Sequence, residues 1–224
     1  HSALSNNDID LLIDYTGTVW TNQMKRSDNP SRERMYEEIS VWEAKNSGAL
    51  VLGRLGFENA YGLAVTEAFS RQFGATSIAD IVSMAPKLTI GGDPEFFERP
   101  EWTSVRDSYA LRFGAHRNFS PTFMYNALKA GEVDVISAYT SDGRIVADDL
   151  IVLEDPNNAF PNYDAILLLS PDNSENENLV STLEPVLGRI GVDAIREANY
   201  SVDRERDKLT PNQAAQFLAQ KVGL

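Results

Sequence analysis

The sequence contains no cysteine and only two histidines, His1 and His116, among its 224 residues. Without cysteine the chain has no disulfide, no thiolate nucleophile and no cysteine–zinc site. The histidines do not recur at the spacing of metal ligands and the carboxylates match no calcium loop, so we expect neither a metal nor another cofactor. Few side chains are left for proton transfer or nucleophilic attack, and this predicts that the protein is not an enzyme.

Long apolar runs and excess positive charge are also lacking. No run approaches the roughly 20 apolar residues that span a bilayer, and the longest, such as residues 165–169, suit buried strands. The net charge is −13. Nucleic acid is therefore not an expected partner, because binding to phosphates requires a basic surface. An acidic surface is compatible with cationic ligands, although it also serves solubility alone.

One segment of the chain occurs twice. Residues 3–16 (ALSNNDIDLLIDYT) reappear as residues 127–140 (ALKAGEVDVISAYT), with five of the fourteen positions identical. Each copy is typical of a helix end, a polar turn and a strand, and each places a tyrosine followed by a threonine where the strand stops. The copies indicate two similar lobes, with Tyr15 and Tyr139 at the carboxyl ends of corresponding strands.

Strands and helices alternate along the whole chain. This pattern predicts an α/β protein whose mostly parallel sheets are flanked by helices on both faces. Ligands of such sheets bind beyond the carboxyl ends of the strands, where Tyr15 and Tyr139 would lie. We expect strands near 8–14, 49–52, 61–65, 88–90, 133–138, 150–153 and 164–169, and helices near 30–45, 77–84, 105–113, 120–129, 177–189 and 211–222.

The two copies differ in what precedes them. A full strand–helix unit stands before the second copy, whereas the first copy begins almost at residue 1. A parallel strand needs a neighbour, so we expect lobe one to be truncated at its N-terminus by roughly 50 or more residues, by comparison with the second copy.

Four tyrosines stand at strand ends or at points where the chain can pass between lobes: Tyr15, Tyr61, Tyr139 and Tyr163. The faces of aromatic rings attract cations by about 0.5–2 kcal/mol each. A quaternary ammonium group has no N–H to donate, so several rings suit it better than one carboxylate. The alternative is that these are ordinary half-buried tyrosines at sheet edges.

Several blocks resemble a known family in the order in which that family carries them. They are DLLIDYTGT at 10–18, FENAYGLAV at 57–65, GDPEFFERP at 92–100, GEVDVISAYTSDG at 131–143, LED at 153–155 and FPNY at 160–163. They are similar to the substrate-binding proteins of osmoprotectant ABC transporters, those for glycine betaine, choline and carnitine.

The resemblance implies a two-lobed type II periplasmic binding protein fold and a box of aromatic side chains around a trimethylammonium group. Matched block by block, the box falls on the four tyrosines named above. The resemblance also implies that Thr18 and Arg99 bind the ligand carboxylate, and an arginine can do so through two parallel hydrogen bonds. For Arg99 an ion pair with Glu95 or Glu101 is an equal alternative, and Thr18 could instead satisfy backbone groups.

Taken together, these patterns predict a solute-binding protein that captures a quaternary ammonium compatible solute between two lobes and delivers it to a membrane permease. Lobe one is expected to comprise residues 1–60 and 162–224, and lobe two residues 61–161, with hinges near Ala60 and Asn162. We expect a monomer with a periplasmic or other extracytoplasmic location, free, membrane-anchored or fused to a permease. The alternatives are an enzyme or a sensor domain on the same fold, using carboxylates in the cleft.

Overall fold

The computed structural model describes the backbone of residues 1–224 and every side chain except those at positions 121 and 122. The chain forms two compact units, each built from segments that are far apart in the sequence. The first unit consists of His1–Asn59, Asn162–Ala198 and Leu209–Leu224, and the second of Ala60–Pro161 and Asn199–Lys208.

One segment departs from the expected boundaries. Residues 162–224 were all expected in lobe one, but residues 199–208 belong to the second unit. Two contacts hold this segment there. The Asn199 side-chain amide donates a hydrogen bond to the Ser141 carbonyl at 2.9 Å. Tyr200 lies so close to Gly143 that a Cβ at that glycine would stand 2.4 Å from the Tyr200 nitrogen.

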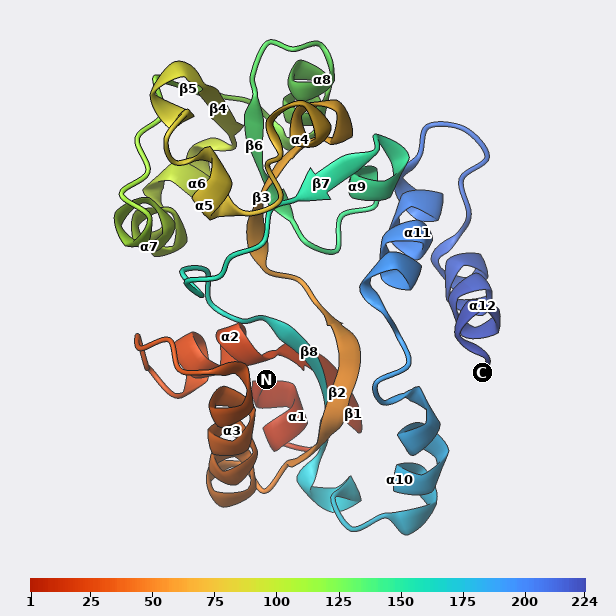
Figure 1. Cartoon of the computed structure of the whole chain (residues 1–224). Helices are drawn as coiled ribbons and strands as arrows, with labels where there is room; N and C mark the ends of the chain where they lie inside the picture. The colour runs from red at the N-terminus through yellow and green to blue at the C-terminus, as the bar shows by residue number, and fades with distance from the viewer. The chain divides into compact units, whose positions relative to one another are not determined.

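The first unit contains a sheet of three strands, β1 (Leu11–Tyr15), β8 (Asp164–Leu169) and β2 (Leu50–Glu58), with β8 in the middle (Figure 1). Both outer strands run antiparallel to β8, so the expectation of a mostly parallel sheet is wrong for this unit. The reason is the path of the chain. It leaves the unit at the end of β2 and re-enters beside that point to begin β8, which must therefore run in the opposite direction.

The core of the first unit lies between β8 and the helices of the amino-terminal segment. Every residue of β8 is buried. Met35 and Ile39, which are spaced by four on helix α3 (Arg32–Asn46), are fully buried and join the same cluster as Ile166 and Leu168. The helices of this unit also include α1 (Ser2–Ser5), α2 (Thr16–Thr18), a π-helical turn (Val19–Gln23), α10 (Glu177–Leu183), α12 (Pro211–Val222) and the first part of α11 (Val192–Asp203).

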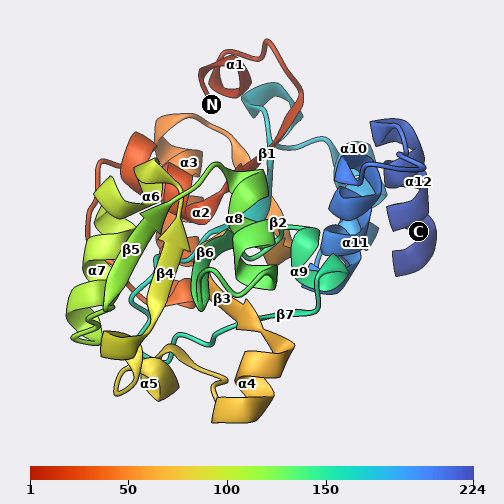
Figure 2. The ribbon, with the colours of Figure 1, turned by 90° about the horizontal axis from the view of Figure 1, so that it is seen from above.

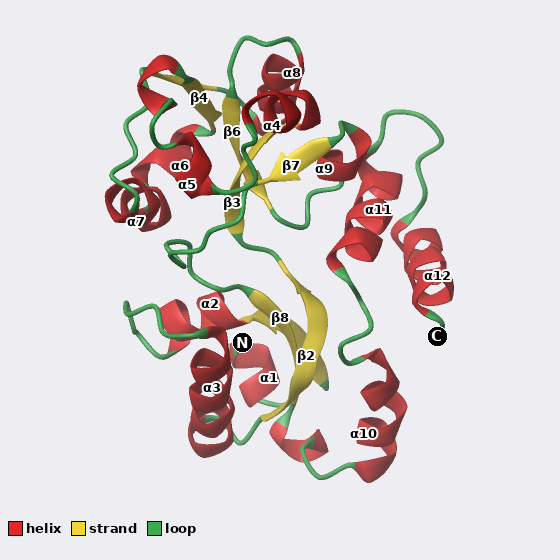
Figure 3. Cartoon of the chain, in the orientation of Figure 1, coloured by secondary structure: helices red, strands yellow, loops and turns green.

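The second unit contains a mixed sheet of five strands. Their order is β5 (Ala115–Asn118), β4 (Thr89–Gly92), β6 (Val135–Tyr139), β3 (Tyr61–Thr66) and β7 (Leu150–Val152). The parallel part comprises β5, β4 and β6, which lie side by side in Figure 2, whereas β3 pairs antiparallel with both β6 and β7. Helices flank the sheet (Figure 3), so the expected α/β class is confirmed. These helices are α4 (Glu67–Phe73), α5 (Ile78–Ile81), α6 (Pro94–Glu98), α7 (Pro100–Ser108), α8 (Pro121–Lys129) and α9 (Arg144–Ala147).

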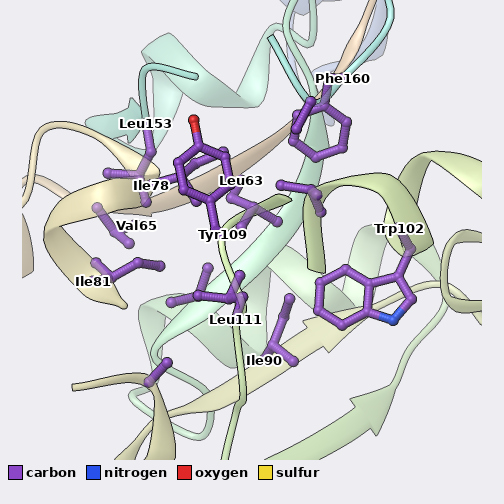
Figure 4. Packing of buried hydrophobic residues seen from close by; sticks show 14 of the residues in the cluster. Leu63, Val65, Ile78, Ile81, Ile90, Trp102, Tyr109, Leu111, Leu153 and Phe160 are labelled. Carbon is purple, nitrogen blue, oxygen red and sulfur yellow. The ribbon is translucent and has the colours of Figure 1, made fainter. Parts of the chain in front are cut away.

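The main core of the second unit packs one face of β3, which is buried on both faces, against the helices that follow it. Figure 4 shows Leu63 and Val65 of β3 among Ile78, Tyr109 and Phe160. Tyr109 and Phe160 both contact Asp155: the Tyr109 hydroxyl donates to one carboxylate oxygen at 2.5 Å, and the Phe160 backbone N–H donates to the other at 2.7 Å. Residues 155–160 are thereby fixed to this unit just before the chain leaves it.

Candidate functional site

Tyr61 and Tyr139 are direct partners across the pair of strands β3 and β6. Residues directly opposite one another in an antiparallel pair project from the same face of the sheet, with their side chains in contact. The two ring centroids are 4.5 Å apart, with an angle of 32° between the planes. The Tyr139 hydroxyl donates a hydrogen bond to the Tyr61 hydroxyl at 2.7 Å. Tyr61 is 7% exposed and Tyr139 is 43% exposed, so the pair presents one aromatic face to the outside.

Tyr61 is held by a second aromatic ring. The ring of Phe96 lies 5.2 Å from that of Tyr61. Phe96 itself is fixed in α6, because the Asp93 side chain accepts a hydrogen bond from the Phe96 N–H at 2.9 Å and so caps the helix. Burial raises the pKa of the Tyr61 hydroxyl well above its usual range, so this residue stays neutral at physiological pH.

Arg99 stands beside the same ring, with its guanidinium carbon 5.3 Å from the centre of Tyr61. The guanidinium forms ion pairs with Glu95 and with Glu101, the second at 3.3 Å. The alternative role considered for Arg99, an ion pair with Glu95 or with Glu101, is thus present with both residues. They involve three of the five N–H donors of the guanidinium, and the side chain is 35% exposed. Donors therefore remain for a further acceptor.

The turn after Tyr139 is fixed from two neighbouring elements. The Thr140 hydroxyl accepts a hydrogen bond from the Ala60 N–H at 3.0 Å, and the Thr140 N–H donates to the Ala60 carbonyl at 2.9 Å. The buried Tyr125 hydroxyl donates to the Asp142 carboxylate at 2.7 Å. These contacts define the direction in which Tyr139 leaves the sheet.

A third element, the carboxyl-terminal end of α11, completes the support of this turn. The Asn199 amide and the Tyr200 backbone contact Ser141 and Gly143, as described above. Because a side chain at position 143 would overlap the helix backbone, only glycine allows this approach. Asn199 is therefore connected to Tyr139 through the turn, although the two residues are distant in the sequence.

In the first unit, Tyr15 and Tyr163 lie near one another at one end of the sheet. Tyr15 is the register partner of Ala165, two positions after Tyr163. Gly17 follows Tyr15 closely, and a Cβ on Gly17 would stand 2.7 Å from Cε1 and Cζ of Tyr163. The Tyr163 ring thus lies directly on the backbone of Gly17. Both tyrosines are half-buried.

The backbone on both sides of Tyr163 is fixed by hydrogen bonds. The Thr16 hydroxyl donates to the Asn162 carbonyl at 3.2 Å and accepts from the Asp164 N–H at 3.0 Å. The Asn59 N–H donates to the Tyr163 carbonyl at 3.0 Å. The first threonine of the Tyr-Thr-Gly-Thr block thus has a structural role that the sequence did not suggest.

Thr18, the second threonine of the block, ends α2 and is half-buried. Within the described part of the chain, no hydrogen bond to its hydroxyl is found. In all, three of the six predicted site residues lie in the first unit and three in the second: Tyr15, Thr18 and Tyr163, and Tyr61, Arg99 and Tyr139.

A cavity of about 710 Å³ lies within the second unit and contains none of these six residues. Part of its polar lining is paired internally. The Arg144 guanidinium binds Asp148 at 2.9 Å and lies over the Tyr125 ring at 4.9 Å. The lining residues are Tyr125, Asn126, Asp142, Arg144, Asp148, Tyr200, Asp203, Arg204, Glu205 and Arg206.

Sequence reasoning missed several residues that support the predicted ones. Gly17 stands in the recognised Tyr-Thr-Gly-Thr block, and a glycine next to a proposed ring could have suggested the close contact. Phe96 lies in the recognised block at 92–100 and could have been found in the same way. Asn199 has no sequence signal, because an isolated asparagine in a polar helix is unremarkable.

Comparison with known proteins identifies the family. Residues 1–220 match the family described as the substrate binding domain of the ABC-type glycine betaine transport system. The ergothioneine transport permease/ergothioneine binding protein EgtU of Helicobacter pylori (strain G27) is 27% identical over 100% of this chain, which spans only 40% of that protein. The carnitine transport binding protein OpuCC of Listeria monocytogenes is 25% identical over 99% of this chain and 72% of its own length.

A solved structure has the same fold. The crystal structure of a glycine betaine/carnitine/choline ABC transporter matches with a TM-score of 0.91 over 99% of this chain and 82% of that chain, at 24% identity. The expected type II periplasmic binding protein fold is thereby confirmed.

Two further structural features bear on function. Among the described residues, every helix is too short or too polar to span a bilayer. The described side chains include no group of three or more His, Asp or Glu residues placed to hold a metal ion.

With its family match over nearly the whole length, the chain belongs to the substrate-binding domains of ABC-type glycine betaine transport systems, which are ligand-binding components of transporters and not enzymes.

Proposed function

We propose that this chain binds a quaternary ammonium solute that also carries a carboxylate or hydroxyl group, such as glycine betaine, carnitine or choline. Tyr15, Tyr61, Tyr139 and Tyr163 bind the ammonium group, while Thr18 and Arg99 bind the carboxylate. The chain then presents the solute to the permease of an ABC transporter. Family membership supports the general role, and the site geometry supports the choice of ligand class.

The observation that carries the proposal is the contact between Tyr61 and Tyr139. Their rings are 4.5 Å apart and joined through their hydroxyls, so the pair is already ordered without a ligand. A methylated ammonium placed against the exposed face of this pair gains about 0.5–2 kcal/mol from each ring that it contacts. Because no rotamer has to be frozen on binding, little of this gain is lost to side-chain entropy. With two further rings from the first unit, the total is a large share of the ~8 kcal/mol of micromolar binding.

The names of the relatives are consistent with this ligand class. Carnitine and ergothioneine differ in size and shape, but each carries a trimethylammonium group and a carboxylate. The groups they share match the two kinds of residue proposed here. Arg99 has N–H donors left for the carboxylate, and the Thr18 hydroxyl is available to support it.

The partners and the location follow from the family. Substrate-binding domains of this kind bind small ligands, work with an ABC permease and act outside the cytoplasm. We propose that the chain binds its solute as a monomer and that its net charge of −13 excludes nucleic acid as a partner. The chain spans only 40% of the Helicobacter protein, whose name includes a transport permease. We therefore propose that this chain acts free, attached to a membrane anchor, or fused to a permease.

Titration calorimetry against choline, glycine betaine and carnitine tests the proposal. We expect a saturable heat with at least one of them. L-Proline and glycine serve as matched controls, because each keeps a carboxylate and an ammonium group but lacks the three N-methyl groups. Equal binding of the controls, or no heat with any quaternary amine, contradicts the proposed ligand class.

A further inference from the structure

Two carboxylates face one another at the point where the chain leaves and re-enters the first unit. Glu58 is the last residue of β2 and Asp164 is the first residue of β8, and the two are register partners. The side chains of such partners project from the same face of the sheet, and like charges at these positions destabilise it. The Asp164 side chain is only 7% exposed and that of Glu58 is 27% exposed, so solvent does not screen the repulsion fully.

Arg32, in the first turn of α3, bridges the two carboxylates. One terminal nitrogen of its guanidinium lies 2.7 Å from Glu58, and the other lies 3.0 Å from Asp164. Burial raises the pKa of the Glu58 carboxyl and of the Asp164 carboxyl, and the charge of Arg32 opposes both increases. Arg32 thus contacts both carboxylates, and its charge favours the ionised form of each.

A second arginine, Arg54, lies beside Asp164, and its charge also opposes the raised pKa of that carboxyl. Arg54 Nε lies 3.5 Å from the second carboxylate oxygen of Asp164, and within the described structure neither atom has a hydrogen-bond partner. The Arg54 guanidinium is instead bound to Glu33 at 2.7 Å and lies over the Tyr36 ring at 4.4 Å.

The charged and titratable groups of this cluster therefore come from three elements. They are Arg32, Glu33 and Tyr36 of α3, Arg54 and Glu58 of β2, and Asp164 of β8.

The cluster is connected directly to a proposed ligand-binding residue. The Glu58 carboxylate accepts a hydrogen bond from the backbone N–H of Tyr163, whose carbonyl accepts one from Asn59. The next residue after Tyr163 is Asp164, the other partner of Arg32. The backbone of Tyr163 is consequently held between the two carboxylates that Arg32 joins, while its ring lies on Gly17.

We propose that Arg32 is a positioning residue for the ligand site: by bridging Glu58 and Asp164 it holds Tyr163, and hence the aromatic ring that Tyr163 offers, in the place where the ammonium group binds. This inference rests on the proposed role of Tyr163 in the ligand site. In this proposal Arg32 acts through Glu58 and Asp164 and is not itself a ligand-binding residue.

Replacement of Arg32 by glutamine, compared with the same change at Arg34, tests the proposal. Arg34 is on the same helix, but its partner is Glu38 in an exposed pair away from the cluster. With the best quaternary amine from the calorimetric screen as probe, R32Q should bind about tenfold more weakly and R34Q within about twofold of the parent protein. Thermal unfolding monitored by circular dichroism checks that both variants are folded. Arg32→Lys, which keeps the charge, should lose less affinity than R32Q.

The pH dependence distinguishes this role from a general loss of structure. In R32Q the positive charge that opposed the raised pKa values is gone, so the pKa of Glu58 and of Asp164 rises further. As the pH falls, one of the two takes up a proton and the repulsion ends. The affinity of R32Q should therefore recover as the pH is lowered from neutrality, whereas that of R34Q should follow the parent protein. The double variant R32Q/E58Q should recover affinity at neutral pH, because glutamine still accepts from the Tyr163 N–H.

Amide hydrogen exchange at Tyr163 in the ligand-free protein provides a measurement that needs no ligand. Exchange should be faster in R32Q than in R34Q and slow again in R32Q/E58Q. If the parent protein binds no quaternary amine, the proposed function is wrong, and exchange at Tyr163 still decides whether Arg32 holds this residue. If R32Q binds like R34Q and leaves exchange at Tyr163 unchanged, the inference about Arg32 is wrong.

Discussion

The ring of Tyr163 lies against the backbone of Gly17, so that a Cβ on Gly17 would stand 2.7 Å from two of its carbons. Real Cβ atoms do not approach so closely, and the same Cβ would also stand 2.8 Å from the backbone carbonyl oxygen of Asn162. The glycine in the Tyr-Thr-Gly-Thr block is thus required by the side chain of a residue almost 150 positions away.

Gly17→Ala should displace the Tyr163 ring. The free energy of unfolding should fall by about 1–3 kcal/mol, as at other overpacked sites, and the quaternary amine should bind about tenfold more weakly. Gly191→Ala is the matched control, because nothing lies within 4 Å of a Cβ at that position. Chemical denaturation and calorimetry on both variants check this, and full affinity in Gly17→Ala would show that the ring is not part of the site.

Asn199→Asp should weaken ligand binding several-fold without unfolding the protein. The change removes the N–H that donates to Ser141 and places a carboxylate against a carbonyl, so the turn that carries Tyr139 loses one of its supports. Asn46→Asp removes the same kind of hydrogen bond, from Asn46 to the Trp42 carbonyl at the exposed end of α3, and should leave affinity unchanged. If the two variants bind the ligand equally well, α11 does not support the ligand site.

Arg99→Gln should change the affinity for a ligand according to whether that ligand carries a carboxylate. If the guanidinium binds a carboxylate, the variant loses about tenfold or more in affinity for glycine betaine and much less for choline, which has no carboxylate. If Arg99 acts only through Glu95 and Glu101, both ligands lose affinity equally. The ratio of the two dissociation constants, measured by calorimetry, distinguishes these outcomes.

Glu43→Gln should change how stability depends on pH. Glu43 is buried in the core of the first unit, and burial raises the pKa of its carboxyl. A carboxyl with a raised pKa binds its proton more tightly in the folded state, so its contribution to stability is present at acidic pH and is lost as the pH rises through the folded-state pKa.

Glutamine keeps an acceptor for the Ser47 hydroxyl, now 2.6 Å from the Glu43 carboxylate, but cannot ionise. The glutamine variant should therefore lose less stability than the parent protein as the pH rises from about 4.5 toward neutrality. Parallel curves of unfolding free energy against pH would contradict this.

The sequence predicted the elements that have a clear apolar pattern or a capping signal. The spacing of Met35 and Ile39 by four residues is typical of the buried face of a helix, as α3 shows. Ser77 and Asp80 form a capping box at the start of the helix expected at 77–84, although α5 ends at Ile81 rather than near Met84. The helix expected at 177–189 ends at Leu183, because Pro185 lies in the 3₁₀ turn that follows and cannot continue an α-helix.

Other elements could not be predicted from local patterns. Every residue of β5 is exposed, so this strand is defined by its backbone pairing with β4 and has no alternation of apolar residues. The buried residues of α11 include Ala194 and Ala198, small side chains that leave a weak apolar pattern. The helix expected to reach Phe113 stops at Ser108, and Ala110 then adopts a left-handed conformation with φ of 50°.

The candidate site likewise contains residues that local patterns predicted and residues that they could not predict. The four tyrosines were identified from strand ends, the repeat and the family blocks, and their role as ligand residues is still a prediction. The bridge from Arg32 to Glu58 and Asp164 joins residues from three distant segments, and only the register of β2 against β8 brings them together. No local pattern carries that information.

The most direct test of the central claim is a comparison of choline with 3,3-dimethyl-1-butanol, which has the same shape but a neutral carbon in place of the ammonium nitrogen. Binding of both should be measured by calorimetry to the parent protein, to Tyr139→Phe and to Tyr139→Leu. If the Tyr61–Tyr139 pair binds the cation through its ring faces, the parent protein and Tyr139→Phe prefer choline at least about tenfold, and Tyr139→Leu loses most of that preference. An equal preference in all three proteins would contradict the account.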